Sequence, residues 1–159
     1  MKNPFGEFKN YAFRLELLQE YIVEEEKSMI QKYINTGNID IDLHKEWLDI
    51  IDNSKNRWAN ILRVHVVDFP ISNYLKYELE VYKYNQQKWE EIFLISRNDF
   101  EWLKLDVNTD FWLFDDSFIL NIIYTDLWEY IKSEYMSENV SKYIKVKNKL
   151  LSVAKHLDL

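Results

Sequence analysis

The sequence predicts an α+β fold, in which an antiparallel sheet of about four to five strands with a C-terminal meander is packed by N-terminal, central and C-terminal helices. Two observations support this prediction. Several segments repeat apolar residues every three or four positions, as a helix with one buried face does. Shorter apolar or alternating segments are separated by turn residues, as strands are. With 159 residues, the chain has the length of one domain, and we expect a single domain over 1–159.

Four segments have the period of an amphipathic helix. They are residues 24–35, a segment that starts after Asp42, residues 72–84 and residues 137–157, and a helical turn capped by Asn98 is expected at 98–103. Three glutamates at 24–26 suit the positive end of the first helix, and Gly37 suits its C-terminal stop.

Alternation and turn residues predict the strands. In 61–67, Leu62, Val64 and Val66 point to one face, and Arg63 and His65 point to the other. The other predicted strands are 91–96, 110–114, 117–124 and 127–135, and the last three form the antiparallel meander. Residues 8–12 indicate a short turn. Residues 13–17 alternate like a strand but also contain helix formers, so that segment stays open between the two.

Composition limits the classes of function. Without cysteine, the chain has no disulfide, thiolate zinc site or cysteine nucleophile, which is typical of a reducing compartment. A net charge of −7 and scattered basic residues argue against direct binding to duplex DNA. Two glycines leave no Gly-rich phosphate loop. No apolar run approaches the roughly 20 residues that span a bilayer. We therefore expect a cytoplasmic protein with no membrane contact and no cofactor.

Glu78 is the most informative candidate site residue. It shares the apolar face of the 72–84 helix with Tyr74, and Arg63 lies on the preceding strand. Because a buried carboxylate needs a partner, we predict a buried ion pair between Glu78 and Arg63. This pair either fixes strand to helix, which is the commoner use, or forms a pocket in which Arg63 binds an anionic ligand.

Arg14 and Glu16 pose a related question. If their segment is extended, both side chains point to one face. We favour a solvated pair, and the alternative is that Arg14 joins Arg63 and Glu78 in one cluster.

The aspartates and histidines carry little evidence of a metal site. Asp is a standard turn residue, so we interpret four aspartates as turn chemistry; magnesium is the one ion that they leave open. These are Asp106, Asp110, Asp115 and Asp116. The histidines His44, His65 and His156 lack ligand spacing, and only His65, beside Arg63, is a candidate acid–base group. We expect no metal site.

Several motifs resemble a known family. They are Ala-Phe-Arg-Leu-Glu at 12–16, Tyr21, Arg-Val at 63–64, Ser-Asn-Tyr-Leu-Lys-Tyr-Glu-Leu at 72–79, Asp-Phe-Trp-Leu-Phe-Asp-Asp at 110–116 and Tyr124. In this order they resemble an uncharacterised bacterial domain family, common in actinomycetes, whose genes often lie beside helix-turn-helix regulators. The resemblance covers roughly residues 10–155. It implies a small cytoplasmic member of a regulator-linked or toxin–antitoxin-like pair, and it supplies no established catalytic residue.

Two functions stay open. The first is a module that binds a basic protein partner, such as a DNA-binding regulator, through acidic and aromatic surface. The second is an enzyme or binder for a phosphorylated or nucleotide-like small molecule, with Arg14, Glu16, Arg63, Tyr74 and Glu78 at the pocket. A water-accessible cavity at those residues favours the second function. A filled core there, with exposed aromatic residues elsewhere, favours the first.

Overall fold

The strand β1 (Tyr11–Glu16) resolves the segment that the sequence left open. The computed structural model describes residues 3–158, and β1 lies near the middle of its sheet. Arg14 is paired with Arg63 of β2 (Asn60–Val67) in the parallel direction and with Trp112 of β4 (Asp110–Phe114) in the antiparallel direction. Both backbone edges of β1 are therefore hydrogen-bonded by distant strands, which local helix propensity cannot anticipate.

In the described part of the chain the sheet is mixed and has seven strands, in the order β6-β5-β4-β1-β2-β3-β7. After β1 come β2 (Asn60–Val67), β3 (Glu90–Ser96), β4 (Asp110–Phe114), β5 (Phe118–Tyr124), β6 (Tyr130–Met136) and β7 (Lys155–His156). The α+β class and the antiparallel β4-β5-β6 meander are confirmed. The prediction of an antiparallel sheet of four to five strands is wrong, because β1, β2 and β3 are parallel. Each crossover between them contains helices, and a helical crossover returns the chain in the same direction.

The helices lie close to their predicted positions. They are α1 (Glu24–Thr36), α2 (Lys45–Asn56), α3 (Asn73–Gln87), α4 (Arg97–Trp102) and α5 (Val140–Val153), with 3-10 turns η1 (Pro4–Gly6) and η2 (Ile41–His44). Gly37 ends α1 in the left-handed conformation at φ 71°, as predicted. Ser96, rather than Asn98, caps α4 by accepting the Asp99 N–H. The last helix stops at Val153, and the residues predicted to extend it form β7 instead.

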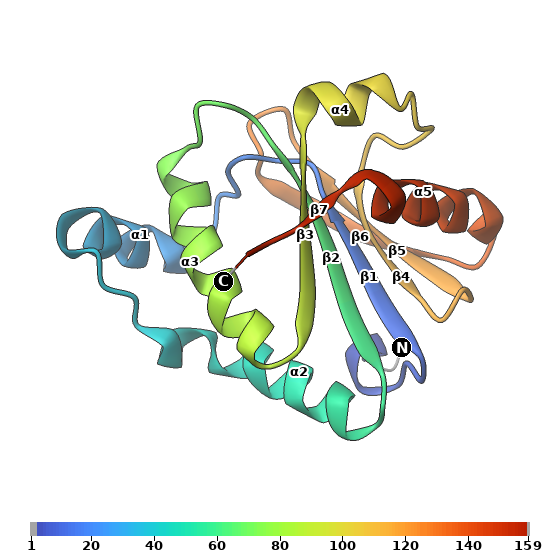
Figure 1. Cartoon of the computed structure of the whole chain (residues 1–159), viewed down its shortest axis with the longest axis horizontal. Coiled ribbons are helices and arrows are strands. Elements are labelled where there is room, and N and C mark those ends of the chain that lie inside the picture. The colour runs from blue at the N-terminus through green and yellow to red at the C-terminus, as the bar shows by residue number, and fades with distance from the viewer. Residues whose placement is uncertain (1–2, 159) are drawn as a thin grey trace.

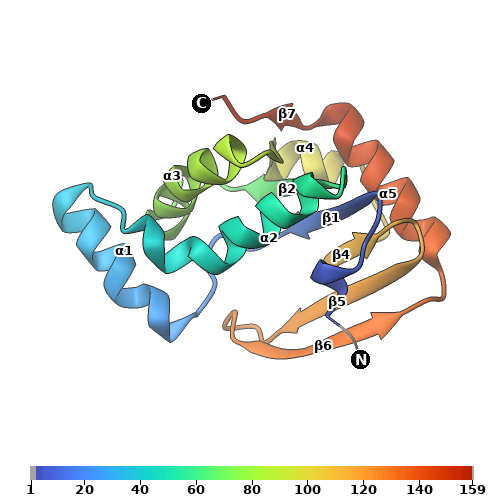
Figure 2. The ribbon, with the colours of Figure 1, turned by 90° about the horizontal axis from the view of Figure 1, so that it is seen from below.

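The two faces of the sheet differ in character and in cover. Figure 2 shows α1, α2 and α3 on one side and α5 on the other, and Figure 1 shows the same layers from the front. Along β1, Phe13 and Leu15 point to the α5 side and are fully buried, whereas Arg14 and Glu16 point to the α2–α3 side. We call these the apolar face and the polar face. No helix in the described part of the chain is both long and apolar enough to cross a membrane.

Candidate functional site

A cluster of ion pairs covers the polar face beneath α2 and α3. Its members are charged or hydrogen-bonding side chains that are at least nine-tenths buried: Arg14, Glu16, Arg63, His65, Tyr82, Glu90 and Asp110. They come from β1, β2, α3, β3 and β4. We call this set the polar cluster.

Glu16 is the centre of the polar cluster. Its Oε1 accepts from Arg63 Nη1 at 2.9 Å and from Arg14 Nε at 3.4 Å, and its Oε2 accepts from the Tyr82 hydroxyl at 2.6 Å. His65 Nδ1 lies 3.1 Å from Oε2. Burial acts to raise the pKa of Glu16, but Arg63, His65 and Arg14 together hold that pKa well below its usual range. The interpretation of Arg14 and Glu16 as a solvated pair is therefore wrong, since both are buried; the extended strand places them on one face, over which α2 and α3 pack.

Arg63 is paired with Glu90 and not with Glu78. Its Nε donates to Glu90 Oε1 at 2.7 Å, and Glu90 Oε2 accepts from Trp47 Nε1 at 3.0 Å. The predicted Arg63–Glu78 ion pair is wrong, because among residues 3–158 Arg63 forms ion pairs only with Glu16 and Glu90. Glu90 was missed because the sequence pattern starts that strand at residue 91. In the fold, the parallel register brings Glu90 opposite Ile61, two residues before Arg63.

Asp110 belongs to the polar cluster, so its interpretation as a turn residue is wrong. It opens β4 and is 2% exposed. Its carboxylate accepts from Arg14 Nη2 at 3.1 Å, from the Tyr21 hydroxyl at 2.6 Å and from the Leu17 N–H at 2.9 Å. Burial raises the pKa of Asp110, and Arg14 opposes that rise.

The turn interpretation is confirmed for the Asp115-Asp116 pair. Both residues have positive φ in the β4–β5 turn, and Asp115 accepts the backbone N–H groups of Lys9, Asn10 and Tyr11. Asp106 is exposed and lies 3.2 Å from Lys142 Nζ. The aspartates are therefore dispersed rather than convergent.

A rim of half-buried acidic and tyrosine side chains borders the polar cluster. The Tyr21 ring lies 5.9 Å from Tyr74 and 5.3 Å from Tyr124. Burial, and then the charges of Glu16 and Glu26, raise the pKa of Glu78 to about 8. Burial also raises the pKa of Glu26, although the Tyr74 hydroxyl opposes it. The rim therefore holds Glu78 largely protonated near neutral pH.

The three histidines lie apart. His65 Nε2 faces the Leu18 carbonyl at 2.8 Å, so that nitrogen must donate, while Nδ1 is 2.7 Å from the Tyr82 hydroxyl. His44 contacts Tyr77, and His156 lies in β7. Across residues 3–158, no group of three or more His, Asp and Glu side chains has the arrangement to hold a metal ion.

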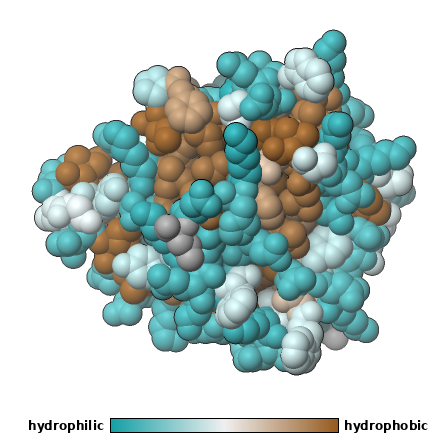
Figure 3. Space-filling view, in the orientation of Figure 1, coloured by the Kyte–Doolittle hydropathy of each residue, from teal (hydrophilic) through white to brown (hydrophobic). Residues whose placement is uncertain are grey.

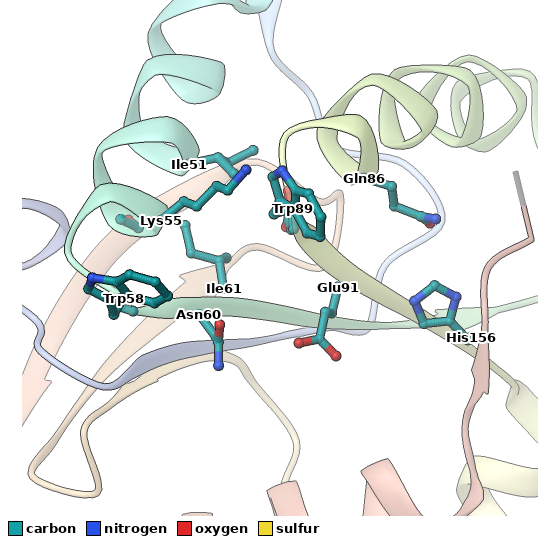
Figure 4. Close-up of a pocket in the computed structure, with 12 residues that line it drawn as sticks. Ile51, Lys55, Trp58, Asn60, Ile61, Gln86, Trp89, Glu91 and His156 are labelled. Carbon is teal, nitrogen blue, oxygen red and sulfur yellow. The ribbon is translucent and has the colours of Figure 1, made fainter.

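A pocket of about 500 Å³ opens at the ends where β2 and β3 begin. Trp58 and Trp89 stand at its mouth with Lys55, as Figure 4 shows, and buried Ile51 and Ile61 lie on its walls. We call it the two-tryptophan pocket. Its remaining lining residues are Ser54, Ala59, Asn60, Gln86, Glu90, Glu91 and His156. Because Glu90 also binds Arg63, the pocket abuts the polar cluster.

Both tryptophans are exposed and occupy strained turns. Trp58 is 92% and Trp89 is 64% exposed, and each lies two residues after a helix, at φ 62° and 83° respectively. Glycine adopts this left-handed conformation without strain, whereas other residues lose roughly 1 kcal/mol or more there. Neither indole therefore contributes much to the free energy of folding. Lys55 Nζ lies 4.0 Å from the centre of the Trp89 ring.

A second hollow of about 500 Å³ lies beside β7. Figure 3 shows apolar side chains gathered in the middle of the face in view, where β3 and the C-terminal segment run. The apolar residues that line this second hollow include Val67, Phe69, Leu94 and Val153. It has neither the paired tryptophans nor the repeated turn geometry of the two-tryptophan pocket, and we assign it no function.

The comparisons with known proteins identify a family but no activity. A family model described as "Domain of unknown function (DUF6879)" matches residues 1–158. The chain belongs to this family. No curated protein and no solved structure matches the chain. Seven of the motif residues quoted for the family resemblance lie in the polar cluster or its rim, although they are distant in sequence: Arg14, Glu16, Tyr21, Arg63, Tyr74, Glu78 and Asp110.

Proposed function

We propose that this DUF6879 domain is a protein-partner-binding module that docks a basic segment of its partner at the two-tryptophan pocket. The observation that carries the proposal is the pair of exposed indoles, Trp58 and Trp89, beside one pocket in turns that disfavour them. Tryptophan is a typical hot-spot residue of protein interfaces. The charges of Arg14, Glu16 and Arg63, by contrast, are paired within the polar cluster, where Asp110 and Glu90 supply further carboxylates.

Charge and ring chemistry support a basic occupant. The Trp58 ring has no stacked ring or cation among the described residues, so its face is open to an arginine or lysine. Lys55 already occupies the Trp89 ring in this way. Glu91 is exposed in the same pocket, and the chain carries a net charge of −7. DNA-binding regulators are basic proteins of the required kind.

The test is a binding titration with two labelled peptides of equal length, one alternating arginine and leucine and the other alternating glutamate and leucine. We expect the arginine peptide alone to bind, and Trp58→Gly or Trp89→Gly to weaken binding roughly tenfold or more. Glycine suits the positive φ at both positions, so these variants keep their turns. Glu91→Lys should also weaken binding of the arginine peptide.

Trp102 supplies the matched control, because it is 79% exposed at the end of α4, outside the two-tryptophan pocket. Trp102→Ala should leave peptide binding unchanged. Equal binding of both peptides, or equal losses in the Trp58, Trp89 and Trp102 variants, would remove the support for this docking site. Duplex DNA in the same titration should not bind, as the acidic balance predicts.

A second candidate function is the binding or conversion of a phosphorylated or nucleotide-like small molecule at the rim of the polar cluster. One observation favours it: Arg14 Nη1 is buried without a hydrogen-bond partner among residues 3–158. A guanidinium nitrogen in that state suits a phosphate oxygen. Glu78, with its pKa raised to about 8, has the proton affinity of a group that exchanges a proton near neutral pH.

Thermal denaturation with AMP and with pyrophosphate tests this second candidate. We expect either probe to raise the Tm, and Tyr74→Phe, which removes one rim hydroxyl, to reduce that rise. Tyr84→Phe, on the exposed side of the same helix, is the control and should not change the response. An unchanged wild-type Tm at millimolar probe would exclude these two ligands.

A further inference from the structure

The strand β6 forms a long, open edge of the sheet. It runs over seven residues, Tyr130–Met136, and among residues 3–158 it pairs only with β5. Tyr130, Ile131 and Tyr135 are large apolar or aromatic side chains that remain 58%, 51% and 42% exposed. An edge strand presents unpaired N–H and C=O groups, so a strand of this length invites pairing with another. The opposite edge, β7, pairs through only two residues.

The β6 sequence is self-complementary about Ser133. Lys132 and Glu134 flank it, Ile131 and Tyr135 lie next, and Tyr130 and Met136 lie outermost. Two copies of β6 that pair antiparallel with Ser133 opposite Ser133 bring each Lys132 opposite Glu134 of the other copy. Opposite charges stabilise such cross-strand neighbours.

We infer that β6 is the interface of a two-fold symmetric homodimer, in which the sheets of two copies join edge to edge around Ser133. Lys132 Nζ and Glu134 Oε1 lie 2.5 Å apart on one face of the strand within a copy. In the dimer, each of these charges also faces the opposite charge of the second copy. The occupant of this edge is therefore a second copy of the chain.

Charge selects this register over its neighbours. Moving the symmetry axis by one residue to Lys132 or to Glu134 sets that charge opposite its own copy, which is destabilising. The β-bulge between β5 and β6 lies at Ile131, because Ile123 pairs with Lys132 and Tyr124 pairs with Tyr130. The regular section of β6 is therefore 132–136, and it contains Ser133 and both charges. Since β7 is too short to template another strand, association stops at two copies.

Charge exchange tests the inference in solution. Wild type should sediment as a dimer at tens of micromolar protein. Lys132→Glu and Glu134→Lys should each weaken self-association roughly tenfold or more, because each sets two like-charged pairs across the interface. An equimolar mixture of these two variants should form a mixed dimer, and the double variant should again form a homodimer.

Lys83→Glu is the matched control, because Lys83 forms a similar exposed ion pair on α3, away from the edge. It should leave the sedimentation of the wild-type protein unchanged. A wild-type protein that is still monomeric at about 100 µM would overturn the inference, because its dimer dissociation constant would then lie above that concentration. A dimer that neither single charge reversal weakens would overturn it as well.

Cross-linking tests the register directly, because the chain contains no cysteine. Directly opposed residues of an antiparallel pair have Cα atoms about 4.5–5.5 Å apart, within the range that a disulfide spans. Ser133→Cys should therefore form a covalent dimer on mild oxidation. Ser152→Cys, exposed on α5, should not. Equal cross-linking of both variants would show random collision and would contradict the proposed register.

Discussion

The two faces of the same strands are stabilised by different physics. On the apolar face, Leu15 and Val64 are fully buried among other hydrocarbon side chains, where each contact is weak and replaceable. On the polar face, their sequence neighbours Glu16 and Arg63 depend on a few specific partners. Removing one partner there leaves an opposite charge buried and unpaired, which costs more than the pair itself contributes. The apolar face therefore tolerates exchange of one hydrocarbon side chain for another of similar size, whereas the polar face tolerates almost no substitution.

Glu16→Gln is expected to break the polar face most severely. The substitution keeps the shape of the side chain but removes the charge that Arg63, Arg14 and His65 share. We expect the free energy of unfolding near neutral pH to fall by roughly 3–5 kcal/mol, measured by urea denaturation. The folded pKa of Glu16 lies below its unfolded value, so the carboxylate stabilises above about pH 4.5 and this contribution is lost as pH falls through the folded pKa.

The difference between wild type and Glu16→Gln should therefore shrink in acid. Glu20→Gln, at an exposed position of the following loop, is the control and should behave as wild type. A Glu16→Gln variant with wild-type stability at neutral pH would mean that the polar cluster does not hold the fold together.

Leu15→Ala is the corresponding substitution on the apolar face. It removes a fully buried side chain and leaves a cavity, so we expect a loss of roughly 2–5 kcal/mol, depending on how far the site relaxes. Because no titratable group is removed, the loss should be the same at acidic and neutral pH. A loss that shrinks in acid, as for Glu16→Gln, would show that the two faces are not independent.

Glu78→Gln should change the free energy of unfolding least, and it should raise this free energy where Glu16→Gln and Leu15→Ala lower it. The folded pKa of about 8 exceeds the usual value of 4.5, so between these values the unfolded chain releases a proton that the folded chain retains. Stability therefore decreases as pH rises through this window. The glutamine variant lacks that slope and should match wild type near pH 5 and exceed its stability near pH 8.5. Urea midpoints at the two pH values measure the difference.

Glu80→Gln is the control for Glu78→Gln, because Glu80 lies on the same helix in a surface pair with Lys83. Its pH dependence should follow wild type. A Glu78→Gln variant that is less stable than wild type at both pH values would indicate that the Glu78 carboxyl has a partner that holds it in the folded state.

Local patterns predicted most elements because their causes are local. Gly37 ends α1 because it adopts the left-handed conformation that stops a helix. Asp115 and Asp116 adopt the positive φ values of the turn between β4 and β5 because aspartate is a typical turn residue. The alternation of Arg63 and His65 with Val64 and Val66 predicted two different faces for β2.

The ion-pair partners within the polar cluster could not be predicted without the fold. Arg63 selects Glu90 over Glu78 because parallel pairing of β2 with β3 brings Glu90 alongside, and no spacing along the chain encodes that contact. The same holds for Asp110, a residue type that is common in turns, because its hydrogen-bond donors are Arg14 of β1 and Tyr21 of the loop that follows β1.

The α+β class and the β4-β5-β6 meander could be predicted from periodicity and turn residues, which act through near neighbours, and the composition alone excludes thiolate chemistry. The strand character of β1, the parallel direction of three strands and the pocket that Trp58 and Trp89 share became known from the fold. Those outcomes depend on backbone hydrogen bonds and burial between segments far apart in the chain, whose pairing is set by the packing of the whole domain.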